Sequence, residues 1–238
     1  MRKDRNFDQI RDFTFETNVN IHAEGSCLVK FGNTHVICTA SIDEKIPPWL
    51  RNSGKGWVTA EYGMMPRSTN TRIDREAAKG KQSGRTQEIQ RLIGRSLRSV
   101  TNLKELGERQ IKIDCDVIQA DGGTRTASIN GGFIALYLAV NQLRKNFNIK
   151  ANIIQNYVAA ISVGIVEGKP LLDLNYEEDS IAQVDANFVI CDNEKISEIQ
   201  VTGEEFFFSE SQYQELYKLS KIGIDQILAK QREVLGAL

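Results

Sequence analysis

The sequence predicts a single α/β domain over residues 1–238, built from two similar halves that each combine strands with a helix. Three observations predict this fold class. Alternating apolar residues predict strands in the first third of the chain, and apolar residues at helical spacing follow within residues 86–100 and 129–143. A further run of strands then precedes a last helix. This succession of strands and helices is typical of one α/β domain.

The composition is that of an ordered globular protein. The chain has 238 residues, of which 41% are hydrophobic and 26% are charged, and its net charge is −1. Its four cysteines form no CxxC pair, so we expect reduced, buried thiols in a cytoplasmic protein. No apolar run is long enough to span a membrane, and the start of the chain lacks the apolar core of a signal peptide.

Strand patterns occupy most of the first third of the chain. Apolar and polar residues alternate over Phe13–Thr17, Ser26–Phe31, His35–Ser41 and Trp57–Met64. The two prolines and two glycines within residues 47–56 predict an ordered loop.

Two amphipathic helices and a strand between them follow. Apolar residues recur at offsets 0, 3, 4, 8 and 11 over Ile89–Val100 and at offsets 0, 4, 7, 11 and 14 over Ile129–Leu143, so each set lies on one helical face. Between them, Ile111–Val117 alternates as a strand and ends in the turn Ala120–Thr126. Four more strands and a last helix are predicted at Tyr157–Val166, Leu171–Tyr176, Val184–Cys191, Ser197–Val201 and Gln212–Val234.

Basic residues are concentrated between residues 67 and 98. This stretch holds nine Lys or Arg residues and three acidic residues, a local charge of +6. Such clustering favours a polyanionic partner, because contacts with phosphates release counterions. We interpret Arg67, Arg72 and Arg75, which lie in a loop, as binding residues. A solvated helix face is an equally good interpretation of the arginines at positions 91, 95 and 98.

The segment DGGTRTASINGG, Asp121–Gly132, predicts an anion site between a strand and a helix. A helix N-terminus offers unpaired N–H groups and partial positive charge, and Arg125 adds a bidentate donor. A tight structural turn capped by Thr124 or Thr126 is the alternative, but Arg125 inside the turn favours the anion. Arg85 opens the preceding helix in the same way. Both helix starts would bind one phosphate if they meet in space.

The chain carries an acidic segment after the predicted strand at 171–176. Asp179 and Asp185 lie six residues apart within it. Near a phosphoryl centre, such carboxylates would hold Mg²⁺ or donate a proton to a departing ribose hydroxyl. On spacing alone, a solvated acidic turn is the more common arrangement.

Four blocks of the sequence together resemble the ribonuclease PH family. They are GKGWVTAEYGMMPRSTNTR at 54–72, SGRTQEIQRLIGRSLR at 83–98, DCDVIQADGGTRTASINGG at 114–132 and LDLNYEEDSIAQVDANFV at 172–189. The blocks are in order and span most of the chain. The resemblance implies a fold like domain 2 of ribosomal protein S5 and a phosphate-dependent 3′-to-5′ exoribonuclease that trims tRNA precursors and releases nucleoside diphosphates.

The same resemblance assigns roles to individual residues. Arg85, Gly123, Thr124 and Arg125 become the phosphate binders. Asp179 and Asp185 become catalytic acids near Mg²⁺. Arg67, Arg72 and Arg75 become candidate tRNA contacts, and the family implies a homo-hexamer arranged as a trimer of dimers.

Two other functions remain as alternatives. A non-catalytic RNA-binding ring subunit of the same fold is disfavoured because both arginines and both aspartates are present. A small-molecule kinase is disfavoured because the chain lacks a Walker lysine. The chain departs from the family pattern at the N-terminal residues 2–5, at 204–208 and at Asn175, where many relatives have Asp. Loss of that carboxylate would weaken Mg²⁺ binding if it holds the metal.

Overall fold

The computed structural model describes residue 2, residues 5–203 and residues 207–236 of the chain. Two of the segments that depart from the family pattern therefore fall partly outside the described residues, at positions 3–4 and 204–206. None of the helices in the described part of the chain is both long enough and apolar enough to cross a lipid bilayer.

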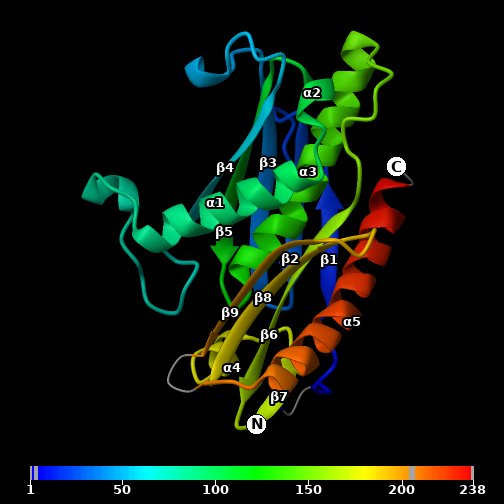
Figure 1. Ribbon diagram of the computed structural model, residues 1–238. Helices are drawn as coiled ribbons and strands as arrows, with labels where there is room; N and C mark the ends of the chain where they lie inside the picture. The colour runs from blue at the N-terminus through cyan, green and yellow to red at the C-terminus, as the bar shows by residue number, and fades with distance from the viewer. Residues whose placement is uncertain (1, 3–4, 204–206, 237–238) are drawn as a thin grey trace.

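A five-stranded sheet forms the first half of the molecule (Figure 1). Its strand order is β1-β2-β3-β5-β4, and the bounds are Phe13–Thr17 for β1, Gly25–Phe31 for β2, Thr34–Asp43 for β3, Gln110–Gln119 for β5 and Trp57–Met64 for β4. Only β4 and β5 pair in parallel. The chain between them contains helix α1, Gly84–Ser99, because a parallel pair needs a crossover.

A four-stranded antiparallel sheet forms the second half. Its strand order is β7-β6-β8-β9, and the bounds are Lys169–Leu172 for β7, Val158–Val166 for β6, Val184–Cys191 for β8 and Ile196–Gly203 for β9. The short helix α4, Tyr176–Asp179, connects β7 to β8, and the last helix α5, Glu210–Leu235, lies along β6 and β7 (Figure 1).

Helix α3, Thr124–Phe147, lies at the centre of the molecule (Figure 1). It contacts β2 and β3 of the first sheet and β6 of the second, and nearly every residue in its first half is buried. The buried Asn130 amide donates to the carbonyl of Ala160 in β6 at 2.9 Å and accepts from its N–H at 2.8 Å. Gly131 allows the close approach to the first sheet, because a Cβ there would lie 2.7 Å from Val29.

The predicted strands and long helices are present, with three differences. The strand expected at Leu171–Tyr176 ends at Leu172, because Asp173 takes a left-handed conformation with φ 55° and α4 begins at Tyr176. Helix α3 is buried on most sides rather than along one stripe, since both sheets cover it. Four one-turn helices were not predicted, at Pro48–Leu50, at Glu76–Lys79, at α2, Leu103–Leu106, and at α4.

We propose that the two sheets unfold as one unit, because one continuous core includes buried residues of both. The chain's two tryptophans, Trp49 and Trp57, report on the first half alone. Phe188→Leu in β8, a fully buried position, is expected to lower the free energy of unfolding by about 1–2 kcal/mol. The urea midpoints from tryptophan fluorescence and from circular dichroism should fall together. A shift in the circular dichroism midpoint alone would contradict the single-domain prediction.

Candidate functional site

A cavity of about 600 Å³ lies between the two halves of the molecule. From the first half it is lined by residues around 69–73, by Arg85 in the first turn of α1 and by the loop that leads into α3. From the second half, Asp179 and Asp185 line it, together with Ser162, Tyr176 and Asn187. The cavity therefore brings together six residues that the sequence singled out, namely Arg85, Gly123, Thr124, Arg125, Asp179 and Asp185.

The N-terminus of α3 opens onto this cavity. Gly123 is its N-cap residue with φ 66°, and among the described side chains none caps its first turn. The Thr126 hydroxyl donates to the carbonyl of Gly123 instead, and the Thr124 hydroxyl is 2.9 Å from the hydroxyl of Tyr62. The structural-turn alternative required a Thr124 or Thr126 cap. Because the described side chains include no such cap, the first N–H groups of α3 are available to an oxyanion.

Two arginines flank this helix start. Arg85 is exposed, whereas the Arg125 side chain is largely buried. The Arg125 guanidinium donates to Gln200 Oε1 at 3.1 Å and lies 3.7 Å from a carboxylate oxygen of Glu88. Burial raises the pKa of Tyr62, while its bond with Thr124 and the charges of Arg85 and Arg125 act in the opposite direction. The positive charge of both arginines therefore reaches the start of α3.

The acidic side of the cavity is built on α4 and β8. Asp179 is the last residue of α4, and Asp185 is the second residue of β8. A capping box fixes α4, in which the Asn175 side chain accepts from the N–H of Glu178 at 2.9 Å and the Glu178 carboxylate accepts from the N–H of Asn175 at 3.0 Å.

The capping box explains the asparagine at position 175. Asn and Asp serve equally well as N-cap residues, and the side chain of Asn175 is occupied by the helix rather than lining the cavity. The departure from the family pattern therefore preserves the local fold. Nothing in this arrangement supports the hypothesis that the lost carboxylate would have held Mg²⁺.

Three arginines near the N-terminus contact the segment before α4, and sequence reasoning missed them. Arg11 binds both carboxylate oxygens of Asp173, at 2.9 and 2.7 Å, and Arg5 binds the same carboxylate at 3.1 Å. Arg2 forms a two-pronged pair with Glu178, at 2.6 and 2.7 Å. A signal existed in the sequence, since an arginine-rich start and an acidic segment within one domain are complementary in charge.

These pairs set the charge state of Asp173, which is almost completely buried. Burial alone would raise its pKa, but the hydrogen bonds and the charge of Arg11 and the charge of Arg5 outweigh burial and lower it. Burial likewise works to lower the pKa of Arg11, and Asp173 reverses that effect. Both side chains are therefore charged at neutral pH.

The candidate RNA-binding arginines lie outside the cavity. The segment between β4 and α1 extends away from the body of the molecule (Figure 1), and Arg67, Arg72 and Arg75 are all exposed on it. Arg72 lies 3.1 Å from a carboxylate oxygen of Asp74. Arg75 lines a second, neighbouring cavity of about 880 Å³.

Two arginines of α1, Arg95 and Arg98, have structural partners. Arg98 stacks over Trp57 at 4.3 Å and donates to the carbonyl of Val58, and Arg95 lies 3.5 Å from Glu198 in β9. These contacts favour a structural role for the two residues and leave the loop arginines as the better candidates for a polyanion.

The donor set of the cavity suits Mg²⁺. Mg²⁺ is commonly bound through one or two carboxylates, waters and substrate phosphates, and Asp179 and Asp185 supply two carboxylates. Within the described residues, no group of three or more His, Cys, Asp or Glu side chains forms a metal site made of protein alone. The arrangement can therefore seat an oxyanion between guanidinium groups and a helix N-terminus, opposite two carboxylates.

Comparison with known proteins gives consistent matches along the chain. Residues 9–141 match domain 1 of the 3′ exoribonuclease family, and residues 156–223 match its domain 2. Proteins named ribonuclease PH from Brucella melitensis and Brucella ovis are each 58% identical over 226 residues, which cover 94% of this chain and 95% of theirs.

Solved structures share the fold at lower identity. Rice (Oryza sativa) Rrp46 superposes with a TM-score of 0.78 at 21% identity and covers 98% of both chains. A chain of the Archaeoglobus fulgidus exosome with RNA bound to the active site superposes with a TM-score of 0.77 at 22% identity, over 97% of this chain and 90% of that one. Identity this low supports the shared fold alone.

The Asp173 pairs predict a dependence of stability on pH. Its folded pKa lies below the unfolded value of about 3.9, so its stabilisation is complete above that pH and is lost as the pH falls through the folded pKa. Asp173→Asn should lower the free energy of unfolding at pH 7 by about 3–5 kcal/mol, because it leaves buried guanidinium groups unpaired. Urea unfolding between pH 7 and pH 3 should show a shallower acid loss in the variant. Parallel pH profiles would assign the acid loss to other groups.

Proposed function

The chain belongs to the ribonuclease PH family of 3′ exoribonucleases, and we propose that the cavity between its two sheets is the active site. The protein is a phosphorolytic 3′-to-5′ exoribonuclease, for which inorganic phosphate is the co-substrate. The observation that carries the assignment of the site is the convergence of Arg85, the start of α3 and Arg125 on one side of the cavity with Asp179 and Asp185 on the other. A non-catalytic ring subunit would have no need of this arrangement.

Phosphate binds between Arg85, Arg125 and the N–H groups at Gly123 and Thr124. One of its oxygens attacks the phosphorus of the last phosphodiester of the RNA. The bond from that phosphorus to the 3′ oxygen of the preceding ribose breaks, a nucleoside diphosphate leaves, and the RNA is one nucleotide shorter. The arginines and the helix N-terminus orient the phosphate and neutralise its charge.

Asp179 and Asp185 act on the opposite side of the reacting phosphorus. They would hold Mg²⁺, and the ion would supply positive charge to the transferred oxygens. A carboxylic acid of this pair also delivers a proton to the departing 3′ oxygen, which becomes the hydroxyl end of the shortened RNA.

The substrates are tRNA precursors, whose backbone phosphates contact Arg67, Arg72 and Arg75. The proposed homo-oligomeric ring fits this use, since a ring would gather the exposed segments of several subunits around one RNA. A trimer of dimers is the proposed form, and an archaeal exosome core shares the fold with a TM-score of 0.73 at 21% identity.

The four cysteines suit a reducing cytoplasm, the proposed location of the protein. They are Cys27, Cys38, Cys115 and Cys191, and all four are buried and free.

Arg125→Ala should raise the KM for phosphate by about 10- to 100-fold, because charge-assisted hydrogen bonds contribute about 1.5–3 kcal/mol each. Nucleoside diphosphate release is measured against phosphate concentration, and RNA binding should be unchanged. Arg91→Ala, an exposed arginine of α1 outside the cavity, is the matched control. An unchanged phosphate dependence in Arg125→Ala would remove it from the phosphate site.

Asp179→Asn should lower kcat by about 100-fold or more without unfolding the protein, because the side chain is exposed to the cavity and has a chemical role. Glu177→Gln, on the same turn but outside the cavity, should retain wild-type turnover. Single-turnover assays at saturating phosphate measure both. Equal activity in the two variants would restore the interpretation of a solvated acidic turn.

Arg72→Ala should weaken binding of a tRNA precursor and reduce the slope of log K against log salt by about 1, as expected when one phosphate contact is lost. Binding is measured between about 50 and 200 mM salt, because phosphate contacts change the affinity measurably over this range. Arg144→Ala, near the opposite end of α3, serves as the control and should keep the wild-type slope. The same slope in both variants would exclude Arg72 from the RNA path.

A further inference from the structure

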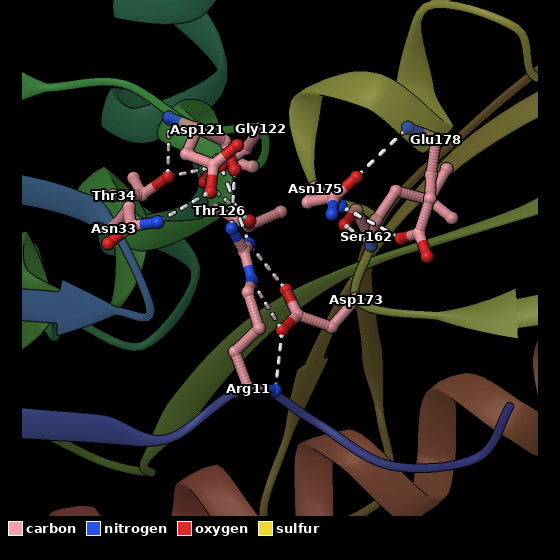
Figure 2. A network of polar contacts seen from close by, with 12 residues as sticks. Arg11, Asn33, Thr34, Asp121, Gly122, Thr126, Ser162, Asp173, Asn175 and Glu178 are labelled. Atoms are coloured by element: carbon pink, nitrogen blue, oxygen red, sulfur yellow. Dashed lines mark hydrogen bonds and ion pairs between the residues drawn. The ribbon is translucent and has the colours of Figure 1, made fainter. Parts of the chain in front are cut away.

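Arg11 contacts both sides of the proposed active site at once. It lies just before β1 and is buried, and its guanidinium faces the segment before α4 and the loop before α3 (Figure 2). On the acidic side, its backbone N–H and two guanidinium nitrogens donate to the carboxylate of Asp173. On the phosphate side, the guanidinium donates to the carbonyls of Asp121 and Gly122.

The contacts with the carbonyls orient the phosphate loop. The Thr34 hydroxyl donates to the carbonyl of Gly122 at 2.6 Å and accepts from the N–H of Asp121 at 2.9 Å. Arg11 and Thr34 therefore hold the carbonyls of residues 121 and 122 away from the cavity. Because a peptide unit directs its N–H opposite to its carbonyl, holding the Gly122 carbonyl in this way directs the N–H of Gly123 toward the proposed phosphate.

The two loops also lie directly against each other. A Cβ on Gly122, whose φ is 74°, would lie 2.5 Å from the carbonyl oxygen of Leu174, and the N–H of Tyr176 donates to the Asp121 carboxylate at 3.3 Å. Arg11 binds Asp173, and Asp173 precedes Asp179 by only six positions. A shift at Asp173 is therefore transmitted to α4, while a shift of the same guanidinium releases the phosphate loop.

Arg2 and Arg5 provide an internal comparison. They bind the carboxylates of Asp173 and Glu178, the carbonyl of Asp173 and the carbonyls of Asn6 and Gln9, and these contacts hold the acidic side. Arg11 binds groups on both sides.

We propose that Arg11 is a positioning residue that sets the phosphate-binding loop at a fixed distance from the turn that carries Asp179. Guanidinium suits this role because its planar fork serves a carboxylate and two carbonyls simultaneously, whereas the three donors of a lysine ammonium all lie on one nitrogen. The inference rests on the proposed function, since it assigns Arg11 to the geometry of that same reaction.

The test compares Arg11→Lys with Arg5→Lys. Lysine at position 11 keeps a positive charge beside Asp173 but gives up the link to the carbonyls of 121 and 122. We expect Arg11→Lys to weaken binding of inorganic phosphate about 10-fold in calorimetry and to lower kcat about 100-fold, since a displacement of 1 Å has effects of this order. Arg5→Lys should lower kcat while leaving the phosphate affinity within twofold of wild type.

Two results overturn the proposal. One is an Arg11→Lys protein whose phosphate affinity stays within twofold of wild type, whatever its kcat, and the other is an equal loss of phosphate affinity in Arg5→Lys. If Arg11→Lys does not fold, the double variant Arg11→Met/Asp173→Asn replaces it, because it removes the link and both charges of the pair while the amide oxygen of Asn can still accept from Arg5 and from the backbone N–H of residue 11. The same criteria apply to it.

Calorimetry separates this inference from the proposed function. Phosphate binding is measured without RNA, so the comparison of Arg11 with Arg5 stands even if wild-type protein releases no nucleoside diphosphate. Inactive wild-type protein would contradict the proposed function. Active wild-type protein with an unaffected Arg11→Lys variant would contradict the positioning role alone.

Discussion

The rest of the structure depends on the burial of α3 between two sheets. The helix contributes the apolar surface that both sheets cover. The pair of hydrogen bonds between Asn130 and the backbone of Ala160 fixes the position of the helix on the second sheet. The helix begins beside the cavity between the two halves, so its N-terminal N–H groups open onto that cavity. The position of the candidate site is therefore a consequence of core packing.

Opposite charges occupy the two sides of this site, and each side is held by structure around it. The anion side consists of a helix start and two arginines. All of these groups line the cavity, so none of them has to be buried as an unpaired charge. The acidic side depends on buried carboxylates, Asp173 above all, that are stable only because arginines pair with them. The N-terminal segment thus contributes to the site without lining the cavity.

The sequence predicted most of the fold, and it singled out six residues that the structure brings to one cavity. Long periodic segments such as 89–100 and 111–117 were predicted correctly, because burial on one face imposes the helix or strand period on apolar residues. The prediction of a strand over 171–176 was partly wrong, because the left-handed Asp173 is stabilised by Arg11 and Arg5, which lie more than 160 residues away in the sequence. The one-turn helices were missed because they are too short to show a period.

Sequence alone determined the chemistry of the chain: a strand-to-helix turn with small residues and an arginine, a second arginine at another helix start, and two aspartates six residues apart. The tertiary structure decided that these groups share one cavity and that Arg11 links its two sides. The physical reason is that residue type and spacing act along the chain, whereas the meeting of loops from two sheets depends on how the whole core packs around α3.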